Sequence, residues 1–488
     1  MKAEKEQQNT TPLLDAITAL IETKPTYFRI PGHRLDKGIS KRWTDKVGSE
    51  IFAYDVTETP FTDDLHSPEG AILQAEKLYA DLYQVDKSFL LVNGTTCGNE
   101  AMILSAAHEG EKIMVARNAH KSAMMGLVLS GATPVYCMPE IIDEFGIQGE
   151  ITKESVEACF LKNPDCKALF LVSPSYYGVT SKLSELAKVC HEHGALLLVD
   201  EAHGGHMYFH EALPQGAMEA GADMCVQSMH KVTGALTQSS VLHVHAQRVD
   251  VEQVGKNLQL VQSTSPNYLL MTSLDCARYE LAGHGKEMVQ QALDLCAYAR
   301  KEIAKIEGFC CMDENTFEEL DLTRLVISAK KIGLSGFALE EILFQKYAVN
   351  MELADEENVL AVVTYANTKE DIERLLFACK EIARIQKEKE NAKPLVRQYP
   401  PFPQIPEQVL TPRQAYFAEF EEVSWEEAKG RVSAEMIAPY PPGIPVVYAG
   451  ERITEEIWNY LTCFKKDNRH IHGSKDGKLE TVRVIKHA

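Results

Sequence analysis

The sequence predicts an α/β fold in which helices cover a mostly parallel sheet, together with a smaller α+β domain and a C-terminal domain. Three observations support this prediction. From about Phe89 onward, short apolar runs alternate with helical stretches. Polar or charged residues directly follow several of these runs. The length of 488 residues is too great for one small core, so more than one domain is expected. In parallel sheets ligands bind beyond the carboxyl ends of the strands, so we expect the functional site there.

Hydrophobic spacing predicts the elements of the first domain. Residues 13–23 repeat apolar side chains at helical intervals and are expected to form an amphipathic helix. Further helices are expected over residues 99–107 and 183–191. The strands are short apolar runs, predicted at Phe89–Val92, Ile113–Val115, Ala168–Val172, Ala195–Val199 and Met224–Gln227.

The second half of the chain changes its pattern. A long helical region is predicted to begin after Asn267 and to run through residues 274–305. Residues 324–365 then mix strands with a helix, which predicts a small α+β domain. A proline-rich stretch at 399–406 is typical of an extended connector to a last module. The predicted domains are the N-terminal helix with the large domain (1–305), the small domain (306–395) and the C-terminal domain (396–488).

The composition excludes several classes of partner. The net charge of −20, from 50 basic and 70 acidic residues, would repel nucleic acid. It mildly favours a cationic small molecule, although a solvated acidic surface explains it more simply. The longest apolar runs have about five residues, far short of a membrane span, and the N-terminus lacks the apolar core of a signal peptide. The twelve scattered cysteines, without a CxxC pair, suit reduced core positions in a cytoplasmic protein.

Asp200 and Lys231 supply the most informative chemistry of the sequence. Asp200 follows the strand at 195–199, and Lys231 follows the next strand, 31 positions later. Pyridoxal 5'-phosphate (PLP) needs an amine for a Schiff base and a carboxylate for its pyridine nitrogen, and these residues would supply both. A charge directly after a buried strand also needs a partner, so we expect a cation beside Asp200. The simpler alternatives are a surface lysine and a carboxylate that caps a helix.

A second group of residues predicts a phosphate site. Residues 93–99 lie between a strand and a helix, where backbone N–H groups and the hydroxyls of Thr95 and Thr96 would form an anion cradle. This signal is weak by itself, and the segment is not a Walker motif. Beside Ser228 and His230 it predicts a cup for the cofactor's phosphate.

Several histidines allow two interpretations. His120 follows a strand, where it would either stack on the cofactor ring or cap the next helix. His203 would pack near the ring or orient the neighbouring aspartate. His206 and His210 stand four positions apart, as in a zinc motif, but Met207 stands where that motif has its glutamate. No metal site is therefore predicted.

Seven short motifs follow one another along the chain: Pro31–His33, Asp63–His66, Asn93–Thr96, His120–Ser122, Asp200–Gly204, Ser228–Lys231 and Pro439–Pro445. Together they resemble the bacterial ornithine/lysine/arginine decarboxylases of PLP fold type I. The resemblance runs from about residue 10 to the C-terminus. It implies a large PLP-binding domain, a small domain and a C-terminal domain. It also implies a homodimer or higher homo-oligomer with active sites at the subunit interface.

The resemblance implies a role for each matching position. Lys231 would carry the Schiff base, Asp200 would bind the pyridine nitrogen, and His120 would stack on the ring. Glu451 resembles the acidic residue near the distal end of the substrate. Lys231 or His230 would return a proton to Cα. The residues that the resemblance implies for the phosphate are Thr95, Thr96, Ser228, His230 and Thr264 of the partner subunit.

The expected activity is PLP-dependent decarboxylation of a basic L-amino acid with release of CO2. The Pro-Gly-His motif starts at residue 31, whereas large members of the family carry a whole domain before it. The chain therefore resembles the short form without the N-terminal wing domain. Short-form members often convert arginine to agmatine. We therefore expect arginine first, then lysine to cadaverine and then ornithine to putrescine, as steps of polyamine biosynthesis.

Two other functions fit part of the same pattern. Another fold-type-I PLP enzyme, such as an aminotransferase or aldolase, would need the same lysine and aspartate. An aminotransferase usually also has an arginine in the small domain for the substrate's α-carboxylate, and Arg324 is one candidate. A non-catalytic scaffold without cofactor is the third possibility. The reaction products would distinguish these functions, because a decarboxylase yields CO2 and an amine.

Overall fold

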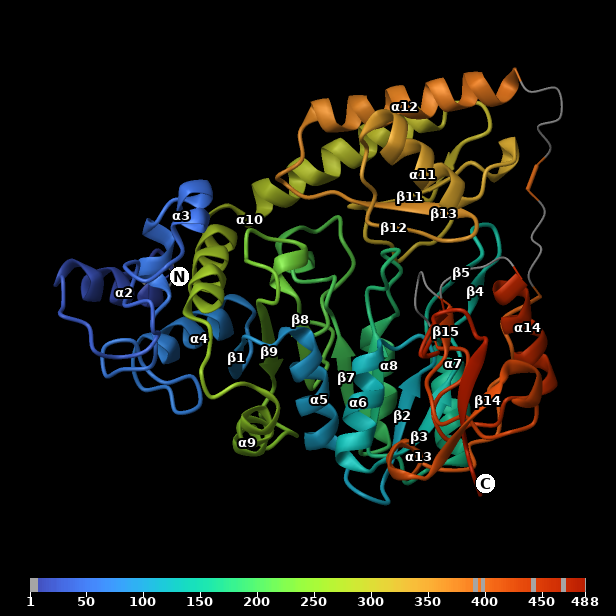
Figure 1. Ribbon diagram of the computed structural model, residues 1–488, viewed down its shortest axis with the longest axis horizontal. Coiled ribbons are helices and arrows are strands. Elements are labelled where there is room, and N and C mark those ends of the chain that lie inside the picture. The colour runs from blue at the N-terminus through green and yellow to red at the C-terminus, as the bar shows by residue number, and fades with distance from the viewer. Residues whose placement is uncertain (1–7, 389–393, 396–399, 440–444, 467–470, 488) are drawn as a thin grey trace. The chain divides into compact units, whose positions relative to one another are not determined.

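The computed structural model describes residues 8–388, 394–395, 400–439, 445–466 and 471–487 (Figure 1). By their contacts, the residues divide into two compact units. The first unit comprises Met1–Ser105 and Leu196–Val289, and the second comprises Ala106–Ala195 and Gln290–Ala488. Each unit thus combines two separate stretches of the chain, so each core depends on contacts between residues far apart in sequence.

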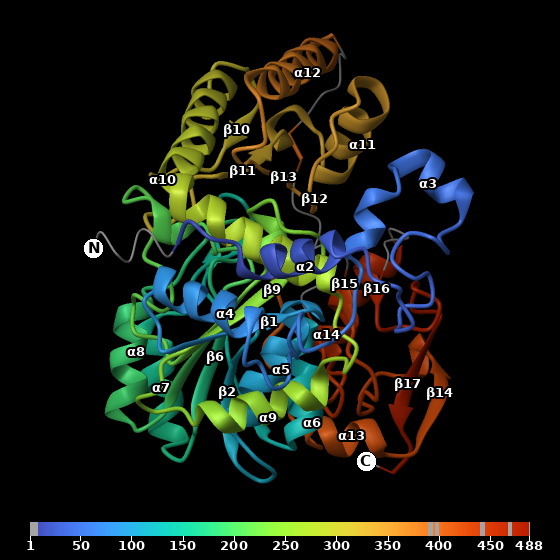
Figure 2. The ribbon, with the colours of Figure 1, turned by 90° about the vertical axis from the view of Figure 1, so that its left-hand side faces the viewer.

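The first unit contains four neighbouring strands, in the order β1 (Lys87–Leu91), β9 (Ser240–Val244), β8 (Met224–Gln227) and β7 (Leu196–Asp200). β7 and β8 run parallel, whereas β9 is antiparallel to β8 and to β1, beside which it is labelled in Figure 2. In this register Asp200 stands opposite Val226. The carboxyl ends of β7 and β8 therefore lie side by side.

Most helices of this unit bury apolar residues, whereas the helix Lys41–Val47 buries none. Leu13 and Ile17 of the first helix are fully buried, and they belong to the same apolar cluster as Ile72, Tyr79 and Met271. The helices of this unit are α2 (Pro12–Glu22), α3 (Lys41–Val47), α4 (Ala71–Leu82), α5 (Gly94–Ala106), α9 (Val251–Val261) and the first part of α10 (Tyr268–Ile303).

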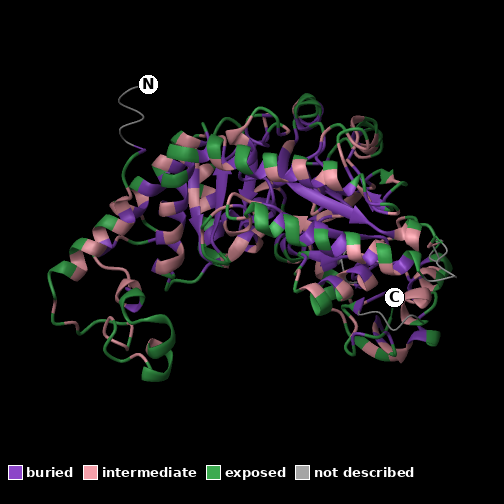
Figure 3. Ribbon diagram, turned by 90° about the horizontal axis from the view of Figure 1, so that it is seen from above, coloured by how far each residue is buried: buried purple, intermediate pink, exposed green. Residues whose placement is uncertain are grey.

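The second unit begins with three parallel strands, in the order β6 (Ala168–Val172), β2 (Lys112–Ala116) and β3 (Thr133–Cys137). The residues of β2 and β6 are almost all buried, as expected for parallel strands covered on both faces. Figure 3 shows strands mostly in the colour of buried residues. The helices that follow the strands of this unit are α6 (Lys121–Ser130), α7 (Lys153–Lys162) and α8 (Leu183–Glu192).

A four-stranded antiparallel sheet follows in the second unit. Its order is β10 (Cys310–Cys311), β11 (Arg324–Ser328), β13 (Asn358–Val362) and β12 (Leu353–Ala354). The helices α11 (Gly336–Tyr347) and α12 (Lys369–Lys387) share one apolar core with these strands. This arrangement is the α+β pattern that was predicted for residues 324–365.

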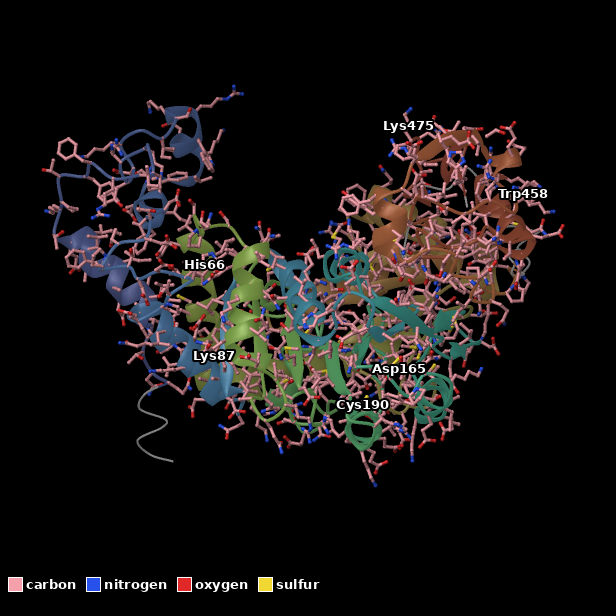
Figure 4. All side chains as sticks on the ribbon, turned by 90° about the horizontal axis from the view of Figure 1, so that it is seen from below. His66, Lys87, Asp165, Cys190, Trp458 and Lys475 are labelled. Atoms are coloured by element: carbon pink, nitrogen blue, oxygen red, sulfur yellow. The ribbon has the colours of Figure 1, made fainter. Side chains whose placement is uncertain are left out.

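The last module has a small core of its own. Trp425 is fully buried at its centre, and its ring stacks on Trp458, which is labelled in Figure 4. Its elements are α13 (Pro412–Phe417), β14 (Phe420–Ser424), β15 (Ala438–Pro439), α14 (Glu455–Lys466), β16 (Ile471–His472) and β17 (Thr481–Ile485), while the hairpin β4 (Ile141–Ile142) and β5 (Ile147–Gln148) belongs to the earlier part of this unit.

The predicted α/β fold with a mostly parallel sheet is confirmed. β8 has the predicted bounds, but α5 begins at Gly94 rather than Asn99, because its glycine- and threonine-rich first turn resembled a loop in the sequence. β9 was not predicted, because the buried polar residues Ser240 and His243 interrupt its apolar pattern. The predicted domain boundaries stay predictions. The proline-rich connector and the Pro439–Pro445 motif lie partly outside the described residues.

Two further observations concern the chain as described. No helix in the described ranges is long and apolar enough to cross a membrane. All twelve cysteines are free thiols, and seven of them are buried. The seven buried thiols occupy core positions, as the sequence predicted, whereas the other five are half-buried.

Candidate active site

The parallel pair β7 and β8 brings the predicted polar residues to one edge of the first unit. β7 ends at Asp200, and β8 ends at Gln227, so Ser228 is the first residue beyond the strand. A single 3-10 turn over Met229–Lys231 then presents Lys231. The register of β7 and β8 is therefore what places these residues together.

Asp200 is a buried carboxylate with neutral partners. Its side chain is 3% exposed, and its Oδ2 atom accepts a hydrogen bond of 2.7 Å from Asn99 Nδ2. Its Oδ1 atom accepts one of 3.1 Å from the backbone N–H of Ala202. The expected cationic partner is not among its contacts in the described part of the chain. A buried carboxylate held only by neutral donors favours a cationic ligand beside it.

Lys231 lies against the imidazole of His203. The distance between Lys231 Nζ and His203 Nε2 is 2.9 Å, and His203 is almost completely buried. Because the amine carries protons, it donates and the imidazole nitrogen accepts. The sequence suggested that His203 packs near a ring or orients Asp200, and this contact with the lysine was not foreseen. The contact fixes the direction of the amine that the sequence assigned as nucleophile.

Three hydroxyl groups converge beside these residues. Thr95 Oγ1 is hydrogen-bonded to Ser228 Oγ and, at 3.1 Å, to Ser240 Oγ. Thr95 lies in the first turn of α5, where backbone N–H groups have no partner within the helix. Gly94 opens this turn with a φ of +69°, a conformation that favours glycine. Hydroxyls at a helix N-terminus fit a phosphate, and Thr96 lies half-buried on the same turn.

His230 lies in the same turn as Lys231. Its Nδ1 atom is 3.1 Å from the carbonyl oxygen of Ser239, so Nδ1 must carry the proton and donate it. Burial lowers the pKa of His230, the bond to Ser239 opposes this, and the nearby charge of Lys231 lowers the pKa further. The neutral ring is thus favoured, and its Nε2 atom is an acceptor. Its predicted phosphate and proton-donor roles would require a second proton on this ring.

His120 lies in the second unit, where it caps a helix. Its Nδ1 atom accepts a hydrogen bond of 3.3 Å from the backbone N–H of Ser122 and is 2.9 Å from Ser122 Oγ. This is one of the two roles that the sequence allowed. The cap fixes the orientation of the imidazole, and stacking on a cofactor ring stays a prediction.

Glu451, predicted to bind the substrate, has a cation of its own within the second unit. Arg117 donates two hydrogen bonds to it, from Nη1 to Oε1 at 2.5 Å and from Nη2 to Oε2 at 2.7 Å. The backbone N–H of Tyr448 adds a third at 2.7 Å. The Arg117 guanidinium also lies over the rings of Tyr136 and Tyr448, at 4.7 and 4.6 Å. The internal ion pair occupies both carboxylate oxygens.

The pair of Arg117 and Glu451 is completely enclosed. The two side chains are 1% and 0% exposed. Burial lowers the pKa of Arg117, but the charge of Glu451 and its hydrogen bonds raise the pKa above its usual value. No role was predicted for Arg117 from the sequence. A bidentate pair of this kind could not be found from spacing, because 334 positions separate the partners.

Thr264 lies in the loop between α9 and α10, and its side chain is exposed. His66, labelled in Figure 4, anchors this loop, because its Nε2 atom is 3.0 Å from the carbonyl oxygen of Ser263. The motif around His66 is itself ordered by Asp63, whose carboxylate accepts hydrogen bonds from the backbone of Glu69 and Gly70. The contribution of Thr264 to a partner subunit stays a prediction.

Arg324, the candidate carboxylate ligand of an aminotransferase, is a core residue of the second unit. It is 1% exposed, and its Nε atom lies 3.6 Å from Oδ2 of the equally buried Asp321. Its side chain also packs closely against Gly178. This environment gives Arg324 a structural role, so its side chain is engaged within the core rather than available for a substrate carboxylate.

Two family models match large parts of the chain, and curated relatives match almost all of it. The family described as "Orn/Lys/Arg decarboxylase, major domain" matches residues 11–327, and its C-terminal domain matches residues 396–477. The chain is 38% identical to the arginine decarboxylase of Halalkalibacterium halodurans and 36% identical to that of Bacillus subtilis. Both alignments cover 98% of this chain and 98% of the relative.

A solved structure shares the fold. The constitutive lysine decarboxylase of Escherichia coli superposes with a TM-score of 0.83 at 21% identity. The match covers 98% of this chain and 82% of that chain. At this identity the likeness concerns the fold alone.

Proposed function

The chain belongs to the Orn/Lys/Arg decarboxylase family and is an enzyme that decarboxylates a basic amino acid, and we propose that arginine is its preferred substrate. Two relatives that match 98% of the chain are arginine decarboxylases. The reaction would release CO2 and leave agmatine. The acidic balance of the chain, with a net charge of −20, also suits a cationic substrate.

One observation carries the site that we propose for this reaction. Within the first unit, an amine, a buried carboxylate with neutral partners and a cluster of hydroxyls at a helix N-terminus lie at the same sheet edge. These groups match the aldehyde, the ring nitrogen and the phosphate of PLP. Lys231 would hold the aldehyde carbon, Asp200 the ring nitrogen, and Thr95 with Ser228 the phosphate. The residues present therefore fit PLP as cofactor.

When bound, PLP supplies an electron sink for the electron pair that remains at Cα as CO2 leaves. The residues of the chain would position the reacting groups and supply the protons. The Asp200 carboxylate would keep a proton on the ring nitrogen, and its bonds from Asn99 and Ala202 hold it in place. His203 orients Lys231 Nζ through their contact. His120, held by its helix cap, would present its imidazole to the ring.

We assign the return of a proton to Cα to Lys231. His230 engages its Nδ1 proton with Ser239, and burial lowers its pKa, so a second proton on this ring is disfavoured near pH 7. The Lys231 amine would carry this proton to Cα. Its contact with His203 would then hold the amine in position.

Replacement of Lys231 by alanine tests the site. The variant should release no CO2 from arginine and should lose the visible absorbance of the bound cofactor. Exposed Lys256 on α9 provides the matched control, and its alanine variant should keep both signals. Incubation of the wild type with arginine, lysine and ornithine, followed by identification of the amine, tests the substrate. Turnover in Lys231→Ala, or a keto acid as product, would refute the proposal.

We also propose a cytoplasmic homodimer in which Thr264 reaches the phosphate site of the partner subunit. Support comes from the exposed position of Thr264 in an anchored loop. Thr264→Asp would place a negative charge against the phosphate and should be inactive, as should Lys231→Ala. Because mixed dimers would contain one intact site, co-expression of the two inactive variants should restore part of the activity. Two variants that stay inactive together would place Thr264 in its own subunit's site.

A further inference from the structure

A cavity of about 350 Å³ lies in the second unit. None of its lining residues belongs to the set assigned above to cofactor or substrate. Its walls come from the β4–β5 hairpin, the loop before β13 and the C-terminal module. The size suits a small organic molecule. Its aromatic lining consists of Tyr177, Phe337, Phe402, Tyr460 and Phe464.

Carboxylates add negative charge to these aromatic walls. The acidic lining residues are Asp143, Asp355, Glu356 and Glu357. Lys330 compensates one of them, because its Nζ atom lies 2.6 Å from Glu357 Oε2. The carboxylate of Asp355 accepts hydrogen bonds from Tyr177 and from backbone N–H groups, all of which are neutral donors. Burial raises the pKa of Asp355 although these donors lower it, so a positively charged occupant beside it would stabilise its charged form.

A buried amide gives an independent indication of a ligand. Gln148 of β5 lines the cavity and is only 8% exposed. Neither its amide nitrogen nor its amide oxygen has a hydrogen-bond partner among the residues that the structure describes. A buried amide without partners is costly, so native proteins rarely keep one unless a ligand or water completes it. Its oxygen can accept a hydrogen bond from a charged N–H group.

We propose that this cavity is a second binding site of the chain, for an organic cation with an apolar stem, of the alkylguanidine or alkyldiamine class. The aromatic faces would bind the apolar stem and attract the cationic group. The carboxylates of Asp143 and Asp355 would neutralise its charge, and the Gln148 oxygen would accept a hydrogen bond from one of its N–H groups. An anion is disfavoured by the carboxylates. A bare metal ion is disfavoured by the apolar walls, which cannot replace its water ligands.

The chemistry of this site is independent of the decarboxylation. The amine product of a basic amino acid is itself such a cation, but the cavity would bind the class whether or not the chain produces it. Agmatine, butylguanidine and 1,4-diaminobutane are therefore suitable probes. They separate recognition of a guanidinium from recognition of an ammonium, because a planar fork and a compact ammonium use the Gln148 oxygen differently.

Equilibrium binding to the holoenzyme tests the proposal without turnover. Titration of the wild type with agmatine should reveal two sites for each chain, one of which remains when a substrate analogue fills the active site. Gln148→Leu keeps the approximate size of the side chain but removes its polar atoms, and should weaken this second site about tenfold. Gln290→Leu, at an exposed position of α10, is the matched control and should bind like the wild type.

A second variant keeps the test decisive if Gln148→Leu does not fold. Asp143 lies in an exposed position on the rim, and Asp143→Asn should weaken agmatine binding about threefold, and less at high salt. Initial rates of CO2 release should be the same in both variants and the wild type. A single site in the wild type, or unchanged binding in Gln148→Leu, would overturn the proposal. A failure of CO2 release would leave these binding results unaffected, so the two proposals fail separately.

Discussion

Two buried carboxylates, one in each unit, differ in what balances their charge. Asp200 is 3% exposed and accepts hydrogen bonds from an amide and a backbone N–H group. Glu451 is 0% exposed and accepts two hydrogen bonds from the guanidinium of Arg117. The first charge has only neutral donors, whereas the second is neutralised by a residue of its own chain. Burial alone therefore does not distinguish a binding group from a structural one.

This difference indicates which buried carboxylates of this fold mark a ligand site. A buried ion is stable when a partner charge and hydrogen bonds surround it, as around Glu451. A buried ion with dipoles but no counter-ion is costly in the empty protein, and a cationic ligand would relieve that cost. Asp200 is in this second state, which is why we assign it to the protonated ring nitrogen of PLP. Glu451 is better explained as the counter-ion of Arg117.

The structural role of Glu451 can be tested by removing its charge. Glu451→Gln would leave the Arg117 guanidinium buried beside a neutral amide, and should lower the free energy of unfolding by about 3–5 kcal/mol. Urea denaturation of the wild type and the variant measures this loss. Asp165→Asn is the control, because Asp165 pairs with Lys112 on the surface and should change the unfolding midpoint little.

A second outcome at Glu451 would reverse our interpretation. If Glu451→Gln keeps the stability of the wild type but raises KM for arginine, the carboxylate binds substrate as the family resemblance implies. Arg117→Met separates the two roles further. It should destabilise the protein like Glu451→Gln, and the double variant should lose less than the sum of both single losses, because the two residues act as one pair.

The same chemical change at Asp200 should have the opposite signature. Asp200→Asn removes a charge that the protein itself does not balance, so the stability of the cofactor-free protein should be unchanged or higher. The rate should fall by roughly 10²–10³-fold, the scale typical of one preorganised electrostatic group. Steady-state kcat and cofactor-free unfolding curves measure the two effects. A variant that unfolds more easily and keeps its kcat would show that Asp200 is structural.

The sequence predicted the residues at the strand ends better than it predicted their hydrogen-bond partners. Asp200, Ser228 and Lys231 were expected to gather because they lie at or shortly after the ends of two apolar strands, and parallel strands end at one edge of a sheet. The partners that define their chemistry were not predicted. Asn99 lies 101 positions from Asp200, and Ser240 lies 145 positions from Thr95. Local periodicity contains no information on contacts at such separations.

The histidines show the same limit at closer range. His203 was expected to pack near the cofactor ring or to orient Asp200. Its contact with Lys231 depends on how the turn after β7 meets the turn after β8, which the sequence does not show. His120 allowed two roles, and only its bond to the N–H of Ser122 identified the helix cap. Spacing therefore predicted which residues gather, whereas the direction of each hydrogen bond required the structure.

Glu201, the residue after Asp200, is a third buried carboxylate, and it is accommodated in another way. It is fully buried and accepts hydrogen bonds from Gln227 Nε2 at 2.7 Å, Tyr208 Oη at 2.8 Å and the backbone N–H of Ala217 at 2.6 Å. Burial raises its pKa to about 7, although these donors lower it. Glu201 thus avoids the cost of a buried charge by taking up a proton, where Glu451 uses an arginine.

The raised pKa of Glu201 predicts the direction of a pH effect on stability. Between the usual pKa near 4.5 and the folded value of about 7, the folded state holds a proton that the unfolded state has released. The contribution of Glu201 is therefore complete below the lower value and is lost as the pH rises through the upper one, at up to about 1.4 kcal/mol per pH unit. Glu201→Gln does not titrate, so its stability should fall less between pH 5 and pH 7 than that of the wild type. Urea midpoints at both values measure this difference, with exposed Glu219→Gln as the control. Parallel curves for the wild type and Glu201→Gln would mean that Glu201 is already ionised in the folded protein, and that neutral donors alone can stabilise a buried carboxylate in this unit.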